Sequence, residues 1–173
     1  MTETIYTIGH STRPIEEFIA LLREHGIEVL VDIRTVPKSR RNPQFGQQSL
    51  AESLDAAGIE YRYMKSLGGL RRPSKDSINT GWRNESFRGY ADHMQTEEFQ
   101  LAVEELVETG AKRRAAIMCA EAVPWRCHRS LVGDALLVRG VDVVDVMGPK
   151  ASRPRKLTPF ARVDGARVTY PPE

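Results

Sequence analysis

Short apolar runs alternate along this chain with amphipathic stretches that end at glycine. The clearest pair is the helical pattern at residues 13–26, which is followed by a nearly continuous apolar run at 27–34. Such a run is typical of a strand buried on both faces, as in parallel sheets. Similar runs occupy residues 4–9, 59–64, 114–121 and 141–148. We therefore predict an α/β fold with a mainly parallel sheet of about five strands, flanked by helices.

The length of 173 residues suits one domain with a real core, and we predict a single domain over residues 1–173. Residues 65–87 contain few apolar side chains and are interpreted as a long, lid-like loop. Residues 151–173 form a C-terminal extension, in which an Asp-Gly turn between β-prone runs predicts a short hairpin.

Charge, apolar runs and cysteine content say more about the cellular compartment of the protein than about its function. The formal net charge of +2 does not by itself require a nucleic-acid partner. The N-terminal residues lack the pattern of a signal peptide, and no apolar run approaches the roughly 20 residues that span a bilayer. Two cysteines make no disulfide framework. We expect a cytoplasmic protein with reduced thiols and no membrane partner, and no oligomeric state is predicted.

Polar or reactive residues follow three of the predicted strands. In an open parallel sheet, ligands bind beyond the carboxyl ends of the strands, so these residues are expected to meet there. The candidates for acid, base or nucleophile are His10 after the first strand, Asp32 after the second, and Cys119 with Glu121 after the fourth. Ser11 and Arg34 accompany them as candidate substrate-binding residues.

The stretch from Met118 to Ser130 holds both cysteines of the chain. Cys127 precedes a predicted helix, and a helix N-terminus lowers the pKa of a nearby thiol and attracts anions. Arg126, His128 and Arg129 could bind a phosphate or carboxylate there. Cys119 or Cys127 is the candidate nucleophile.

Structural interpretations remain open for the same residues. Cys119 could be a small core residue, and Cys127 with His128 could cap and pack a helix. His10 could bind a loop carbonyl. Asp32 requires a partner, and Arg34 is the obvious one. We expect the two helical histidines, His25 and His93, to be ordinary surface residues.

Two further interpretations concern the cysteines and their neighbours. The cluster contains metal-ligand types, but the Cys-x7-Cys spacing matches no structural zinc pattern, so we predict neither a metal nor another cofactor. A metal-dependent enzyme stays as an alternative. The thiols could also form a redox pair, although they are not in a Cys-x-x-Cys arrangement.

Two loops border the same edge of the sheet. The basic segment 34–45 contains Ser39 and Arg41, which could contact phosphates, or it could be a solvated loop. Gly68 and Gly69 could allow the lid to close over a substrate, or they could form a tight turn.

Five motifs together resemble the domain-of-unknown-function family 488. They are TIGHS, DIRTVPKSR, LGGLR, CAEAVPWRCHR and LTPFARVDGARVTYP, spread over essentially the whole chain. The resemblance implies a compact α/β domain, a motif cluster treated as an active site, and a link to nucleotide or nucleic-acid processing. The matching positions are His10, Ser11, Asp32, Arg34, Pro37, Ser39, Gly68, Gly69, Cys119, Glu121, Cys127, His128 and Arg129.

The sequence thus favours a small enzyme that acts on a phosphate-bearing substrate, a nucleotide or nucleic acid, with its reaction class open. The alternative is a non-catalytic nucleic-acid-binding module whose basic loops form the binding surface.

Overall fold

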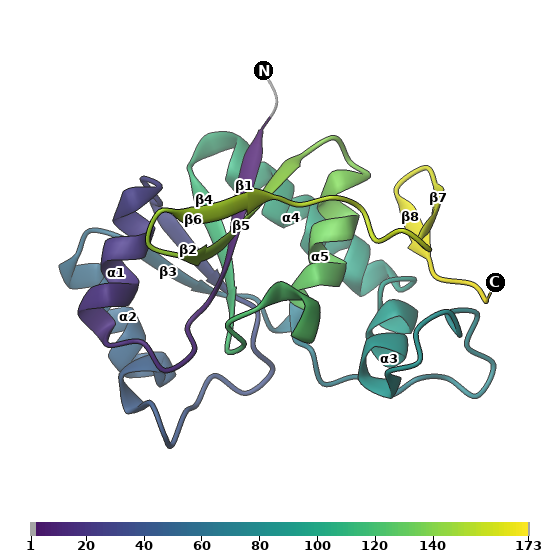
Figure 1. The fold of residues 1–173 in the computed structure, drawn as a ribbon, viewed down its shortest axis with the longest axis horizontal. Helices are drawn as coiled ribbons and strands as arrows, with labels where there is room; N and C mark the ends of the chain where they lie inside the picture. The colour runs from purple at the N-terminus through teal and green to yellow at the C-terminus, as the bar shows by residue number, and fades with distance from the viewer. Residues whose placement is uncertain (1–2, 173) are drawn as a thin grey trace.

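The central sheet confirms the predicted α/β fold. The structure is a computed structural model and describes residues 3–172. In this part of the chain, six strands form one sheet in the order β3-β2-β4-β1-β5-β6 (Figure 1). β1 to β5 run parallel, and β6 is antiparallel to β5. Their bounds are Thr4–Gly9 (β1), Val29–Asp32 (β2), Glu60–Tyr63 (β3), Ala115–Cys119 (β4), Asp142–Gly148 (β5) and Ala151–Pro154 (β6).

A sixth strand, β6, extends the predicted parallel sheet at the edge of β5. All four residues of β6 are exposed, so the segment carries no run of buried apolar side chains that could have indicated a strand. It forms because the chain reverses at Pro149 and Lys150 and pairs with the free edge of β5.

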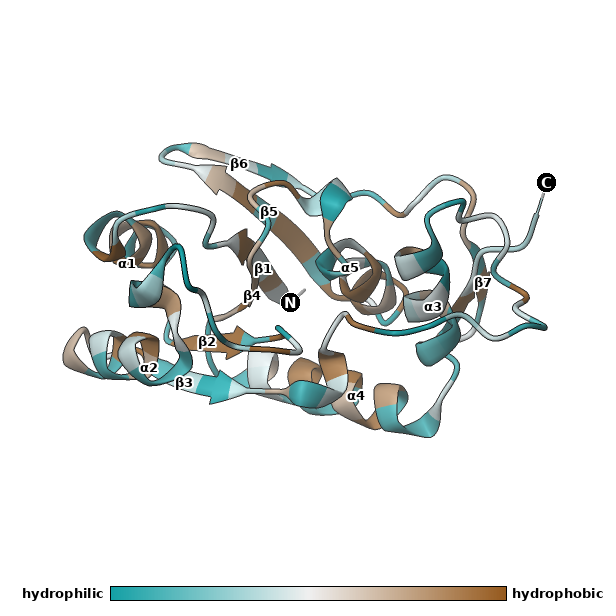
Figure 2. Ribbon diagram, turned by 90° about the horizontal axis from the view of Figure 1, so that it is seen from below, coloured by the Kyte–Doolittle hydropathy of each residue, from teal (hydrophilic) through white to brown (hydrophobic). Residues whose placement is uncertain are grey.

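Helices cover both faces of the sheet (Figures 1 and 2). Side chains alternate along each strand, so Leu30 and Met118 join the core beneath α1 and α2, while Val31 and Ile117 join the core beneath α4 and α5. α3 lies beyond α5, away from the sheet. The helices are Ile15–Glu24 (α1), Gln47–Ala56 (α2), Glu85–His93 (α3), Glu97–Lys112 (α4) and Arg129–Leu137 (α5).

The strand order places a crevice at the carboxyl ends of β1, β4 and β2. The chain passes from β1 to β2 across one face of the sheet, and β4 inserts between them from the other face. Backbone pairing continues beyond the strands, since His10 N donates to Cys119 O at 2.9 Å and Ser11 N to Ala120 O at 3.0 Å. A Cβ on Gly9 would lie 1.5 Å from Glu121 O, so only glycine permits this approach.

The C-terminal extension ends in the predicted hairpin, formed by β7 (Arg162–Asp164) and β8 (Arg167–Thr169). This hairpin lies at the end of the molecule opposite α1 and α2 (Figure 1). Within residues 3–172, no helix has the length and apolar character needed to cross a bilayer.

Candidate functional site

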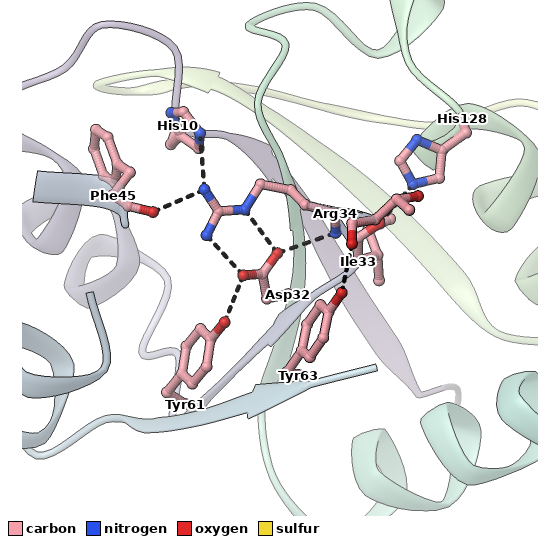
Figure 3. A network of polar contacts seen from close by, with 9 residues as sticks. His10, Asp32, Ile33, Arg34, Phe45, Tyr61, Tyr63 and His128 are labelled. Carbon is pink, nitrogen blue, oxygen red and sulfur yellow. Dashed lines mark hydrogen bonds and ion pairs between the residues drawn. The ribbon is translucent and has the colours of Figure 1, made fainter. Parts of the chain in front are cut away.

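An enclosed ion pair follows β2. Asp32 Oδ2 accepts from Arg34 Nη2 at 2.7 Å, and Asp32 Oδ1 accepts from Arg34 Nε at 2.9 Å (Figure 3). The Tyr61 hydroxyl donates to Asp32 Oδ2 at 2.6 Å, and burial with this carboxylate raises the pKa of Tyr61. The predicted partnership of Asp32 with Arg34 is therefore confirmed. It occupies both oxygens of a fully buried carboxylate, which suits a positioning role better than acid or base chemistry.

His10 lies behind the same arginine. Its ring stacks on Phe45 at 4.3 Å, and Arg34 Nη1 lies 3.5 Å from His10 Nε2. His10 Nδ1 is 2.8 Å from Ser11 O. Burial outweighs this contact and lowers the pKa of His10, so the ring is neutral at pH 7. The contact to Ser11 therefore requires the proton on Nδ1.

The two cysteines are buried and unbridged, and each influences the ionisation of the other. Burial opposes ionisation of Cys119, but a hydrogen bond with Cys127, the charge of Arg129 and the backbone of Glu121 outweigh it and hold the pKa of Cys119 below its ordinary value. Burial and the proximity of Cys119 raise the pKa of Cys127. Of the two thiols, Cys119 is therefore the one that ionises first.

Arg129 supplies the positive charge beside these thiols. Its side chain is fully buried, and its Nη2 donates to Ala122 O at 3.2 Å. Among the described residues, no hydrogen-bond partner lies within reach of its Nε or Nη1, and no carboxylate forms an ion pair with it. An uncompensated buried guanidinium is costly, so it favours a negative charge on the neighbouring sulfur.

His128 connects the cysteines to the end of β2. Its Nε2 lies 2.8 Å from Ile33 O, and its Nδ1 lies 3.4 Å from Cys127 Sγ. Burial lowers the pKa of His128 to about 4, so the ring is neutral at pH 7 and Nε2 carries the proton. Nδ1 is therefore unprotonated and can accept a hydrogen bond from the Cys127 thiol.

Gly69 packs against the ring of His128. A Cβ at residue 69 would lie 2.4 Å from His128 Nδ1, and one at Gly68 would lie 2.6 Å from Thr35 Oγ1. Neither glycine has the positive φ of a left-handed turn. These residues serve close packing of the loop onto the site, which is a different role from the hinge that the sequence suggested.

A pocket of about 320 Å³ opens beside the thiols, and we call it the cysteine pocket. Predicted and unpredicted residues line it together, and Glu121 and Arg126 are exposed at its surface. Its lining is Arg34, Thr35, Val36, Lys38, Gly69, Leu70, Ser86, Phe87, Cys119, Ala120, Glu121, Arg126, Cys127 and His128.

Other predicted residues line a separate hollow of about 370 Å³, here called the arginine hollow. Ala120 and Glu121 border both spaces, so the loop after β4 stands between them. The predicted residues therefore form two adjoining sites. The arginine hollow is lined by His10, Ser11, Thr12, Ser39, Arg40, Arg41, Asn42, Ala120, Glu121 and Ala122.

The loop after β3 is held in place by hydrogen bonds. Asp92 accepts from Ser74 N at 2.8 Å, from Ser77 Oγ at 2.6 Å and from Asn79 Nδ2 at 2.8 Å. Asn79 Oδ1 accepts from Tyr170 N at 2.8 Å, which joins the loop to the C-terminal extension. The last residues of the predicted 65–87 loop belong to α3.

The expectation for His93 is wrong. Its side chain is buried, and its Nε2 lies 2.7 Å from Ser66 O at the start of the loop. The residues around His93 in the sequence are mostly polar, so they do not indicate that this face of α3 packs on the loop.

A family model described as a domain of unknown function, DUF488, matches residues 14–136. This is more than half of the chain. The chain belongs to the DUF488 family. The matched region contains both cysteines, Asp32 and Arg129, whereas His10, Ser11 and the C-terminal extension lie outside it. The family is thus shown over a shorter part of the chain than the sequence motifs suggested. No curated protein and no solved structure matches the chain.

The cysteine pocket also contains residues that the sequence did not indicate. Val36, Lys38 and Leu70 line the cysteine pocket, and each lies inside a motif that already carried a predicted residue. Phe87 reaches the pocket from α3, and nothing in the sequence indicated this. Among residues 3–172, no group of three or more His, Cys, Asp or Glu side chains is arranged to hold a metal ion.

Proposed function

We propose that this chain is a small enzyme that acts on a phosphate-bearing substrate, a nucleotide or nucleic acid, with Cys119 as its nucleophile. One observation supports this most. A fully buried arginine, which has no carboxylate partner among residues 3–172, lies beside a thiol whose pKa is lowered, at the edge of a pocket. A core cysteine needs no such cation, whereas a nucleophilic cysteine does.

Two cations at the pocket surface would bind the substrate. Lys38 and Arg126 are exposed and line the cysteine pocket, so both are available to a phosphate group. Arg34 contributes less directly, because its Nε, Nη1 and Nη2 already donate to Asp32 and to Phe45 O. The apolar side chains of Val36, Leu70 and Phe87 would accept the uncharged part of the substrate, such as a base.

The chemical step uses Cys119 and Glu121. The Cys119 thiolate attacks the electrophilic centre of the substrate and forms a bond to sulfur as the bond to the leaving group breaks. Glu121 is exposed beside it and would give the leaving group a proton, then take one from the water that releases the product. Cys127 and Arg129 hold the sulfur as an anion before the attack.

A substrate screen with paired variants tests this proposal. The reduced protein is incubated with mononucleotides, dinucleotides and short oligonucleotides, and products are separated by mass. We expect turnover that is lost in Cys119→Ser and reduced in Lys38→Ala and Arg126→Ala. Lys112→Ala is the matched control, because Lys112 is exposed on α4 and does not line the cysteine pocket. Turnover that is equal in wild type and in a folded Cys119→Ser variant would overturn the nucleophile.

A non-catalytic nucleic-acid-binding module is the second candidate, and the arginine hollow favours it. Arg40 and Arg41 are exposed on the loop after β2, beside Ser39 and Asn42. In that case a single-stranded oligonucleotide would bind with an affinity that falls as salt rises. Double replacement of Arg40 and Arg41 by alanine should reduce the salt slope by about 1 to 2. Binding without any turnover in the screen would favour this candidate.

A further inference from the structure

Cys127 makes more contacts than it would need if its only role were to donate a hydrogen bond to Cys119. Its sulfur is contacted by His128 Nδ1 and by Arg129 N, each at 3.4 Å, and it lies in the same pocket wall as Cys119. The seven residues between the cysteines form a loop that returns through the 3-10 turn Pro124–Arg126. This loop turns the chain back, so that the thiol before α5 lines the same pocket as the thiol at the end of β4.

We propose that Cys119 and Cys127 form a reversible redox pair, in which a peroxide oxidises Cys119 and Cys127 captures the product as a disulfide. This inference rests on the proposed function only in taking Cys119 as the more nucleophilic thiol. It assigns to Cys127 a role that the proposed reaction does not use.

The first step is oxidation of Cys119 by hydrogen peroxide. The thiolate attacks one peroxide oxygen, so an S–O bond forms and the O–O bond breaks. The second oxygen leaves as hydroxide and takes a proton to become water. Cys119 is then a sulfenic acid, and the peroxide has been reduced.

The second step joins the two sulfurs. His128 Nδ1 orients the Cys127 thiol by accepting its hydrogen bond, since the ring is neutral and Nε2 faces Ile33 O. Cys127 Sγ attacks Cys119 Sγ, the S–S bond forms and the S–O bond breaks. The departing hydroxide takes the proton of the Cys127 thiol and leaves as a second water. Two thiols are oxidised for each peroxide reduced to two waters.

Arg129 makes this disulfide easy to reduce. In the reduced form, the buried guanidinium favours a negative charge on Cys119, and its Nε and Nη1 have no partner among the described residues. The disulfide removes that negative charge and leaves the cation uncompensated. Because the dithiol form is the one stabilised, the bond should be reversible by glutathione, unlike a structural disulfide.

Mass spectrometry of the full chain tests the pair. Reduced protein is treated with hydrogen peroxide, quenched and measured intact and as peptides without reductant. We expect an intramolecular 119–127 disulfide, seen as the loss of two hydrogens at every protein concentration and reversed by glutathione. Oxidation of Cys119 while Cys127 remains a free thiol would overturn the proposal, as would an absence of oxidation at both residues.

Single substitutions of the two cysteines test which thiol is oxidised first. In Cys127→Ser, the sulfenic acid should persist on Cys119 and be labelled by dimedone, whereas in Cys119→Ser the remaining thiol should stay unoxidised under the same conditions. Protein unfolded in urea is the matched control, because both thiols then react alike. Labelling of Cys127 in folded Cys119→Ser at the wild-type rate of Cys119 would contradict the assigned order.

The same experiment separates this inference from the proposed function. A reversible disulfide in wild-type protein that shows no turnover on any phosphate-bearing substrate would support the pair and overturn the enzyme. Turnover that depends on Cys119, without disulfide formation, would support the enzyme and overturn the pair.

Discussion

Asp32 shows how strongly one residue at the strand ends depends on its partners. The buried carboxylate accepts from Arg34 and from Tyr61, and these contacts hold the backbone after β2 beside His128 and the cysteine pocket. The partnership with Arg34 could be predicted from the sequence, because a charge at the end of an apolar strand requires compensation. The contact with Tyr61 could not, because it depends on the register between β2 and β3.

Tyr61→Phe tests this network at the residue scale. We expect the free energy of unfolding to fall by about 2 kcal/mol, because the hydrogen bond lost is made to a buried carboxylate. Tyr63→Phe is the matched control. It removes a hydroxyl that donates to the neutral Thr35 O at 2.8 Å, and it should cost about 1 kcal/mol. Urea unfolding of the two variants measures both values, and equal losses would contradict a charged network at Asp32.

Gly69 provides a second residue-scale prediction. Gly69→Ala would place a methyl group against His128 Nδ1, so we expect a loss of about 1 to 3 kcal/mol and a changed alkylation rate of the neighbouring Cys127. Gly148→Ala is the control, because a Cβ there meets nothing within 4 Å and the residue has no positive φ. A Gly69→Ala variant as stable as Gly148→Ala would mean that the loop does not pack on the site.

At the scale of elements, α5 joins the site to the C-terminal extension. Asp134 on α5 is fully buried and accepts from Arg155 Nη2 at 2.8 Å, Thr158 Oγ1 at 2.6 Å and the Tyr170 hydroxyl at 2.7 Å. The sequence indicated α5 and the hairpin, but the polar network between them follows from tertiary packing. The same limit applies to β6, whose exposed residues carry no periodic signal.

Asp134→Asn is therefore predicted to loosen the extension. It leaves Arg155 without its carboxylate, and breaking a buried pair costs about 3 kcal/mol or more. Hydrogen exchange should rise first in residues 156–170. Asp142→Asn is the matched control, since Asp142 is exposed at the start of β5. Unchanged exchange in the extension would contradict its attachment through α5.

At the scale of the whole molecule, buried histidines link stability to pH. Burial is the largest influence on His10, His93 and His128, and it lowers the pKa of each. A histidine with a depressed folded-state pKa stabilises the protein fully above its unfolded pKa of about 6.5 and loses that contribution as the pH falls toward the folded value. Burial is set by the assembled fold, which explains why His93 looked like a surface residue in the sequence.

For His128, with a pKa of about 4, the expected loss between pH 7.5 and pH 5 is about 2 kcal/mol. Urea unfolding at the two pH values measures the total loss. His128→Asn should reduce that loss by about 2 kcal/mol. A pH dependence that is the same in wild type and in His128→Asn would contradict a buried neutral imidazole.

The most direct test of the account is the titration of the two thiols, followed through the ultraviolet absorbance of thiolate in wild type, Cys119→Ser and Cys127→Ser. We predict that wild-type protein forms one thiolate below the ordinary midpoint of about 8.5, and that this step persists in Cys127→Ser and disappears in Cys119→Ser. In unfolded protein, the two thiols should ionise with the same midpoint. If both thiols ionise only at or above the ordinary midpoint in folded protein, Cys119 is a core residue, and the account of an arginine-activated nucleophile is wrong.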